Sequence, residues 1–563
     1  MKPLSIVIVV VAALITGCSS KPAQTVPTAT PTSSQVSVPA GGTLNVGIVD
    51  ALPTASWDPV LAPDSTVRTF GPLVMATLLR PSADGSQPEP GLATSAVSDG
   101  AGTTWTVSLR SGLTFADGSP LTAEDMAFTL TEDASQQQLT GRFGADAQGS
   151  YFVSATATDV QTVVVKLRAP NALLDRTVFA APEFGCLKKD FGGKARAAYF
   201  KRPVSCGPYE APKLSNRSTQ MSLTRNASYF APNQVGPDAI FVRELAEGSG
   251  AQGFINGGGD VVIDPRSATS APRASASATP TLSSTPSASA TPSASATPSA
   301  SATPVLSPSP SPSPVVDAPD QLVQSSKPGR VSALLLRSLP PTRDNNVRIA
   351  VQSALNIKTL VQKQSAAVEP TAGLVPPGWP GAVSVPVPQT NINLGKTAVS
   401  LLPKSSRSLE LLVRSGNPDN LAQAQLIAQQ LKVVGLAVDI KQASTARYAI
   451  DLAAGSFDLA LISLAPRVAV ASDVTLQWSV TAGLGSGWPI DQTTASYAGQ
   501  LSVPAFGADA QKAAQSFQSL VLEPIEAVAL SARPHQALVG NRVQGLVVRL
   551  DGSLPLDRAS VRN

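Results

Sequence analysis

The stretch LRSGLTFADGSPLTAEDMAFTL, residues 109–130, predicts a strand that turns twice and then enters a helix. Asp117 and Gly118 form a pair that tolerates the left-handed backbone of a tight turn. Thr122, with Asp125 three residues later, predicts a capped helix start before an apolar run. These residue types in this order are typical of scaffold, so the stretch predicts part of an α/β or α+β domain without catalytic side chains.

The first residues have the pattern of an export signal. Lys2 precedes a mainly apolar run of twelve residues, Leu4 to Ile15, and small residues then lead to Cys18. About 20 apolar residues are needed to span a bilayer, so residues 1–17 are expected to be a signal peptide and not a membrane anchor. The end of the run resembles a bacterial lipobox, in which Cys18 carries lipid and begins the mature chain. An ordinary secretory signal with an incidental cysteine is the alternative.

Two stretches have a composition that cannot build a core. Residues 18–40 are mostly Ser, Thr, Pro, Gln and Ala, and residues 267–316 contain three tandem copies of Ser-Ala-Ser-Ala-Thr-Pro followed by a Ser-Pro run. Such segments bury too little apolar surface to offset the entropy of ordering. We expect a disordered tether at 18–40 and a disordered insert at 267–316, which is either a plain spacer or an O-glycosylated segment.

Charge and composition argue against several function classes. The net charge is only +4 and the basic residues are scattered, which leaves no basic patch for nucleic acid. The single histidine, His535, excludes a histidine-based triad or zinc cluster. Residues 394–397 (LGKT) have the tail of a phosphate loop but lack its first glycine. We therefore expect no enzyme, no cofactor and no metal site. Cys186 and Cys206 are an even pair in an exported chain and are expected to form a disulfide, although spacing alone cannot establish the geometry.

The order of motifs resembles one protein family. The string in 109–130 resembles the signature of the extracellular solute-binding proteins of ABC importers, in the peptide and nickel-binding family. Residues 57–59 (WDP) stand where that family has Leu-Asp-Pro, and residues 90–93 (PGLA) match a further motif. Residues 206–209 (CGPY) and 455–459 (GSFDL) resemble two later ones.

The resemblance implies a two-lobed α/β fold of the periplasmic-binding-protein type, type II, peptide-binding class. The first lobe is expected at 41–266 with an extra subdomain at about 70–165, the second α/β lobe at 317–525, and a return to the first lobe at 526–563. Independently, the strand, helix and strand pattern over 409–440 predicts a parallel strand pair in the second lobe.

The resemblance also implies a ligand site, but its motifs are eroded in this chain. In relatives that bind peptides, the strand that begins at the Phe-Asp pair (residues 457 and 458 here) continues with Gly-Trp-x-x-Asp, and that aspartate pairs with the ligand's amino terminus. In this chain Arg467 stands in place of the aspartate. A guanidinium repels an ammonium group, whereas it can donate two parallel hydrogen bonds to carboxylate or phosphate oxygens. We infer a ligand that is neutral or anionic, the alternative being that this arginine points to solvent. The candidate ligand residues are Pro63, Asp64, Ser65, Thr66, Thr445, Tyr448, Leu464 and Arg467.

The function that the resemblance implies is capture of a small, oligopeptide-like solute in a cleft between two lobes. The expected partners are this solute, an ABC permease in the membrane, and the membrane itself through lipid on Cys18; the chain is expected to be a monomer on the extracytoplasmic face of the cell membrane. The competing hypothesis is a cell-envelope lipoprotein of the same fold that binds a partner or regulates without transport.

Overall fold

The structure is a computed structural model. It describes residues 38–48, 52, 56–61, 66–82, 87–136, 139–143, 145–146, 149–213, 219–245, 250–263, 320–362, 364, 368–379, 381–382, 386–415, 418–466, 471, 474, 478 and 508–562. The expected signal peptide, Cys18, almost all of the tether at 18–40 and the insert at 267–316 lie outside these residues. Among the described helices, none is both long and apolar enough to cross a membrane.

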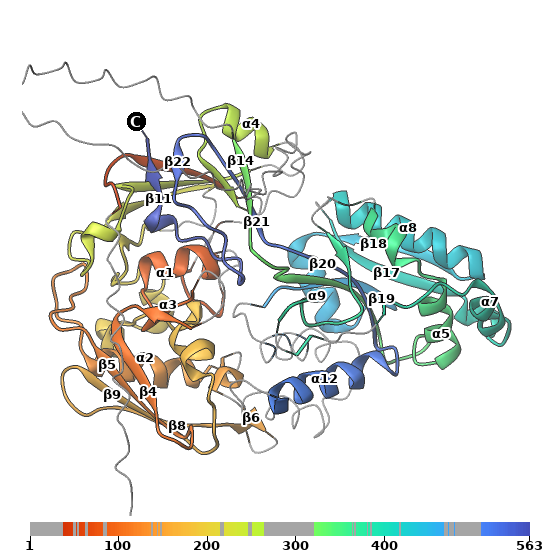
Figure 1. Cartoon of the computed structure of the whole chain (residues 1–563), viewed down its shortest axis with the longest axis horizontal. Helices are drawn as coiled ribbons and strands as arrows, with labels where there is room; N and C mark the ends of the chain where they lie inside the picture. Colours follow the sequence, from red (N-terminus) through yellow and green to blue (C-terminus); the bar gives the residue numbers. More distant parts are fainter. Residues whose placement is uncertain are drawn as a thin grey trace, which may run out of the picture. The chain divides into compact units, whose positions relative to one another are not determined.

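The first lobe is built on a mixed seven-stranded sheet (Figure 1). Its strands, in spatial order, are β10 (Tyr209–Glu210), β11 (Gln220–Arg225), β12 (Ala239–Glu244), β1 (Thr43–Ile48), β13 (Val261–Ile263), β21 (Gln536–Val539) and β14 (Gln321–Gln324). Strand β1 runs parallel to both neighbours, β12 and β13, whereas β21 is antiparallel to β13 and β14. Leu44, Val46 and Ile48 of β1 are buried and alternate with Thr43, Asn45 and Gly47, as the two-residue period of a strand requires.

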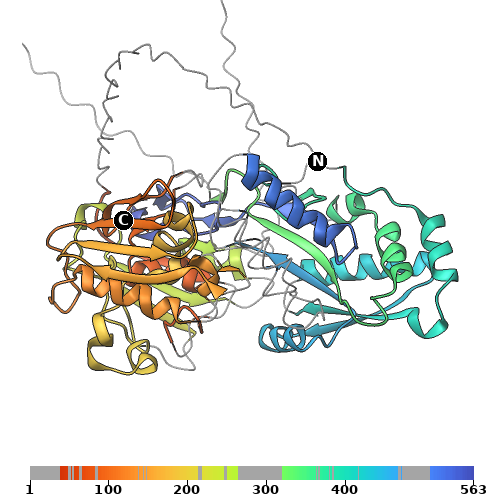
Figure 2. The same cartoon turned by 90° about the horizontal axis from the view of Figure 1, so that it is seen from below.

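The stretch 109–130 lies in a four-stranded subdomain of the first lobe. Its sheet has the order β4 (Ala93–Ser98), β5 (Thr104–Leu109), β9 (Thr162–Leu167) and β8 (Phe152–Ala157), all antiparallel. Helix α2 (Ala123–Ala134) packs on this sheet, as Figure 2 shows for the orange helix and strands. The predicted capping box is confirmed, because the Asp125 carboxylate accepts hydrogen bonds from the backbone N–H and the hydroxyl of Thr122.

The second lobe has its own six-stranded sheet and its own core. The spatial order is β16 (Glu369–Pro370), β20 (Ala527–Arg533), β15 (Arg330–Leu336), β19 (Leu459–Leu464), β17 (Ser408–Arg414) and β18 (Ala437–Ala443). The predicted parallel pair is confirmed: β17 and β18 run parallel and are joined by helix α8 (Pro418–Val434). The other α-helices in the described part of this lobe are α5 (Asn345–Ala354), α6 (Ile357–Gln362), α7 (Ile392–Ser400), α9 (Thr445–Ala454) and α12 (Ala508–Leu522).

Shorter elements complete the first lobe. The chain around the subdomain forms helices α1 (Gly71–Val74), α3 (Arg196–Tyr199) and α4 (Gly250–Asn256). Three small two-stranded antiparallel sheets are β2 (Leu79–Arg80) with β3 (Glu89–Pro90), β6 (Ala145–Asp146) with β7 (Gly149–Ser150), and β22 (Val543–Gln544) with β23 (Ser560–Val561).

Strand pairing places the lobe boundaries later than the sequence predicted. We expected the second lobe to begin at 317, but β14 belongs to the first sheet. We expected the return to the first lobe at 526, but β20 pairs with β15 in the second sheet and the returning strand is β21. The strands β14–β15 and β20–β21 form one antiparallel ribbon between the sheets, because Ser325 N–H donates to His535 O (2.9 Å) and Gly329 N–H to Arg533 O (3.1 Å).

Candidate functional site

The Asp-Pro motif that precedes the expected ligand segment is held by Arg196. The guanidinium of Arg196 donates from Nε to Asp58 Oδ2 and from a terminal nitrogen to Asp58 Oδ1, both at 2.9 Å. Oδ1 also accepts the backbone N–H of Val60 at 3.1 Å. The same guanidinium reaches Glu132 of α2 at 3.0 Å. The entry to the ligand segment is therefore fixed to the helix of the signature stretch.

Arg68 connects the two segments from which ligand contacts were expected. It lies in a π-helical turn, Thr66–Phe70, which overlaps the end of the expected ligand segment 63–68. Its guanidinium donates to the carbonyl of Ala465 at 3.0 Å and to that of Pro466 at 2.9 Å, just beyond the end of β19. It also donates to the carbonyl of Asp551. The structure thus brings the end of β19 and the segment after the Asp-Pro motif to one buried arginine.

Arg68 ends the segment, 63–68, for which the resemblance implied ligand contacts by position alone, but it was not among the candidate ligand residues. Its acceptors are backbone carbonyls, which every residue carries, so no side-chain pattern marks the partners. The signal that was available is its position at the end of the expected ligand segment.

The predicted ligand residues fall into three groups. Pro63, Asp64, Ser65 and Arg467 lie outside the described residues. Thr66 begins the π-helical turn and Thr445 begins α9. The side chains of Tyr448 and Leu464 are placed by the structure.

Leu464 lies in the core of the second lobe, and Tyr448, which is half-buried, packs against that core. Leu464 is 1% exposed and packs in the core, because it points to the buried face of β19. Tyr448 donates its hydroxyl to the carbonyl of Leu461 at 2.9 Å, which braces α9 against β19, and burial raises the pKa of Tyr448. The described contacts of both side chains are packing contacts, and their expected part in ligand binding stays a prediction.

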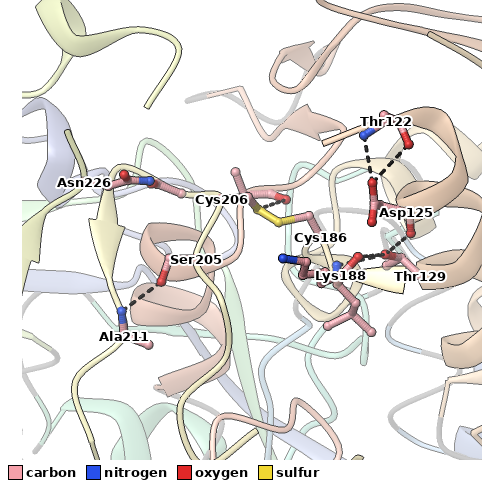
Figure 3. The surroundings of a disulfide bond; sticks show 12 residues. Thr122, Asp125, Thr129, Cys186, Lys188, Ser205, Cys206, Ala211 and Asn226 are labelled. Atoms are coloured by element: carbon pink, nitrogen blue, oxygen red, sulfur yellow. Dashed lines mark hydrogen bonds between the residues drawn. A yellow bond between two sulfur atoms is a disulfide. The ribbon is translucent and has the colours of Figure 1, made fainter. Parts of the chain in front are cut away.

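Cys186 and Cys206 are joined by a disulfide, with their Cα atoms 6.5 Å apart (Figure 3). Each cysteine also donates its backbone N–H to the C-terminal end of α1 or to the residues just beyond it: Cys206 to Val74 O at 3.1 Å and Cys186 to Ala76 O at 3.0 Å. A Cβ on Gly207 would lie 2.3 Å from Leu73 O, so only glycine permits this close approach. The disulfide therefore joins the two ends of the loop 186–206, and both ends are hydrogen-bonded to the segment that follows Arg68.

Helix α2 holds this loop from the other side (Figure 3). Thr129 accepts the backbone N–H of Leu187 at 2.9 Å, and Asp125 accepts that of Lys189 at 2.9 Å. The Asp125 carboxylate thus caps α2 and fixes the loop beyond Cys186. The helix of the signature stretch therefore supports the loop that the disulfide closes.

A small pocket borders Arg68 within the first lobe. Its volume is about 40 Å³, and three arginines and two aspartates line it among mainly apolar side chains. Arg80 donates to Asp557 at 3.2 Å and to the hydroxyl of Tyr229 at 2.6 Å. The charged lining residues are Arg68, Arg80, Arg549, Asp551 and Asp557.

Metal-binding chemistry finds no support in the described part of the chain, where no cluster of three or more His, Cys, Asp or Glu side chains occurs. The one histidine, His535, is 5% exposed and lies in the ribbon between the sheets. Its Nδ1 is 3.2 Å from the guanidinium of Arg330. Residues 394–397, which resemble the tail of a phosphate loop, lie inside helix α7.

Solved structures share this fold at low sequence identity. The dipeptide-binding protein of Pseudoalteromonas sp. SM9913, in complex with Met-Leu, is 15% identical with a TM-score of 0.75; the alignment covers 92% of this chain and 100% of that one. DppA of Helicobacter pylori, in complex with the peptide STSA, is 16% identical with a TM-score of 0.73 and covers 93% and 99%. NikA of Staphylococcus aureus, in complex with Ni(L-His)2, is 16% identical with a TM-score of 0.70 and covers 92% and 100%.

The sequence itself identifies the family. No curated protein matches the chain significantly. The model of the bacterial extracellular solute-binding proteins, family 5, middle region, matches residues 87–485, which is more than half of the 563 residues. The chain therefore belongs to the bacterial extracellular solute-binding proteins of family 5.

Proposed function

We propose that the protein is the solute-capturing component of an ABC importer, anchored by lipid on Cys18 to the extracytoplasmic face of the cell membrane. Its solute is a small, oligopeptide-like molecule that is neutral or anionic. The observation that carries the proposal is the junction at Arg68, where the segment after Asp58-Pro59 meets the end of β19. The relatives of known structure support it, since two of them hold short peptides.

The charge of the solute follows from the residues after β19. Aligned from Phe457, Arg467 stands where relatives that bind peptides carry the aspartate that pairs with a free amino terminus. Arg68, in the segment that meets the end of β19, is also a cation. Two guanidinium groups repel an ammonium and favour carboxylate oxygens.

Calorimetry tests this selectivity with pools of short peptides that carry a free or an acetylated amino terminus. The wild type is expected to bind acetylated or acidic peptides at least as tightly as free-amine peptides, and Arg467→Asp to reverse the order. Arg343→Asp makes the same change of charge on an exposed arginine of the second lobe and is the control. Tight wild-type binding that requires a free amine would contradict the proposal.

The anchor is tested separately by expressing Cys18→Ser with its own leader. The variant is expected in the medium and the wild type in the membrane fraction; retention of the variant in the membrane would count against lipidation.

Mass spectrometry of molecules that co-purify with the mature protein distinguishes transport from the alternative function, because a partner-binding lipoprotein would retain a protein or a lipid-linked molecule in place of a small solute.

A further inference from the structure

The guanidinium of Arg549 is buried in the pocket beside Arg68. Arg549 is 8% exposed, and its backbone is fixed by a turn in which Gly552 N–H donates to Arg549 O at 3.0 Å and Arg549 N–H to Ser553 O at 3.1 Å. The side chain lines the pocket. Among the residues that the structure describes, neither a hydrogen bond nor an ion pair engages this guanidinium.

The other charged groups of the pocket are already engaged. Arg68 donates to the carbonyls of residues 465, 466 and 551. Arg80 pairs with Asp557. Asp551 accepts the N–H and the hydroxyl of Ser553 at 2.9 and 2.7 Å. Of the charged residues that line the pocket, Arg549 is therefore the one whose side chain makes neither a hydrogen bond nor an ion pair with the described part of the chain.

A buried cation that lacks a hydrogen-bonded counterion is costly, because the loss of water is compensated only in part by more distant charges. Burial lowers the pKa of the Arg549 guanidinium, and the nearby Asp551 and Asp557 oppose the shift. An arginine nevertheless stays protonated in proteins. Its five donors have the fork geometry that matches a carboxylate, and an apolar surrounding strengthens such a pair.

We propose that this pocket binds one small anionic group, of the size and charge of a carboxylate, through Arg549. A volume of about 40 Å³ holds a few water-sized atoms, which suits a carboxylate head or a chloride ion and excludes a whole peptide. The group is either a free small anion or the carboxylate of the captured solute. Only the second source rests on the proposed function.

The first experiment uses the mature protein and simple anions. The melting temperature is followed while sodium acetate or sodium chloride replaces a bulky sulfonate at constant ionic strength. The wild type is expected to show a saturable rise, with a half-saturation concentration at least tenfold higher in Arg549→Gln. Arg558→Gln, whose arginine pairs with Glu89 at 3.3 Å outside the pocket, is expected to respond like the wild type.

The absence of a saturable response in the wild type, or an equal response in Arg549→Gln, would overturn the proposal. If Arg549→Gln does not fold, Arg549→Lys replaces it: it keeps the charge but loses the fork, and an unchanged half-saturation concentration would again contradict the inference.

A second arm distinguishes the two sources of the anion. Peptides with a free carboxyl terminus are compared with their amides against the wild type and Arg549→Gln. If the solute supplies the group, free-carboxyl peptides bind the wild type at least tenfold more tightly and the variant loses this preference. If both forms bind alike, or no peptide binds, a saturable acetate response still supports a free anion, so the site stands when the proposed solute does not.

Discussion

Replacing Arg196 by glutamine should loosen the entry to the ligand segment. Arg196 makes two hydrogen bonds of 2.9 Å to Asp58, whose side chain is 6% exposed, while its own side chain is 19% exposed. Removing one partner of a buried ion pair costs about 3–5 kcal/mol, because the other charge stays behind unpaired. Since Arg196 is partly solvated, we expect the lower end, about 3 kcal/mol, or a factor on the order of 100 in the opening equilibrium.

The assay is amide hydrogen exchange of residues 56–61 and of α2, because local opening reports on this contact without requiring the whole chain to unfold in one step. Arg202→Gln is the matched control: its partner Glu210 lies 3.9 Å away and both side chains are exposed, so its loss should cost less than about 1 kcal/mol.

A double variant separates charge from packing. Arg196→Gln combined with Asp58→Asn leaves no unpaired carboxylate at residue 58, so it should lose less protection than the sum of the two single variants. The reasoning would be refuted if residues 56–61 exchanged no faster in Arg196→Gln than in Arg202→Gln.

Three further predictions concern stability. Changing Cys186 and Cys206 to alanine should cost about 3 kcal/mol in urea unfolding, since the bridge closes a separation of 20 residues; two alkylatable thiols in the unreduced wild type would contradict the bridge. Burial raises the pKa of Asp133, although the charge of Arg196 opposes this shift. The protonated side chain therefore contributes its full share of the unfolding free energy below the unfolded pKa of about 3.9, and this share is lost as the pH rises through the folded pKa. Asp133→Asn should therefore be more stable than the wild type at pH 7 but not at pH 4, and an equal difference at both would argue against a raised pKa. Replacing 267–316 by a Gly-Ser linker of about twelve residues should change the unfolding free energy by less than about 1 kcal/mol, because such a connection is long enough to join parallel strands, and β13 and β14 both pair with β21; a larger loss would mean that the segment packs on a lobe.

Local chemistry explains what could be predicted from the sequence. The turn at Asp117-Gly118, the capped start of α2 and the parallel pair β17–β18 depend on residues close together in the chain, and Gly118 indeed has a φ of +80°. The even number of cysteines left after Cys18 led to the pairing of Cys186 with Cys206.

Long-range pairing explains what could not. The short strand β14 has the same pattern whichever sheet it joins, and only its pairing with β21 assigns it to the first lobe. Similarly, Arg68 and Arg196 gain their roles from partners far away in the chain, at residues 465–466 and 58. Leu464 looked like a ligand position because it aligns with a tryptophan of the relatives, yet alternation along β19 turns it into the core.

The ribbon of β14–β15 and β20–β21 makes the second lobe an insertion within the first. The chain leaves and re-enters at neighbouring strands, where Gly329 and Arg533 are hydrogen-bonded, so the two cut ends lie about 5 Å apart. A gene that encodes residues 330–533 alone would retain all six strands of the second sheet. It would lose Leu550, which the C-terminal segment contributes to the core of that lobe. Among the buried members of the described core clusters of this lobe, Leu550 is the one outside 330–533, so the surface it covers is where an excised module would need redesign.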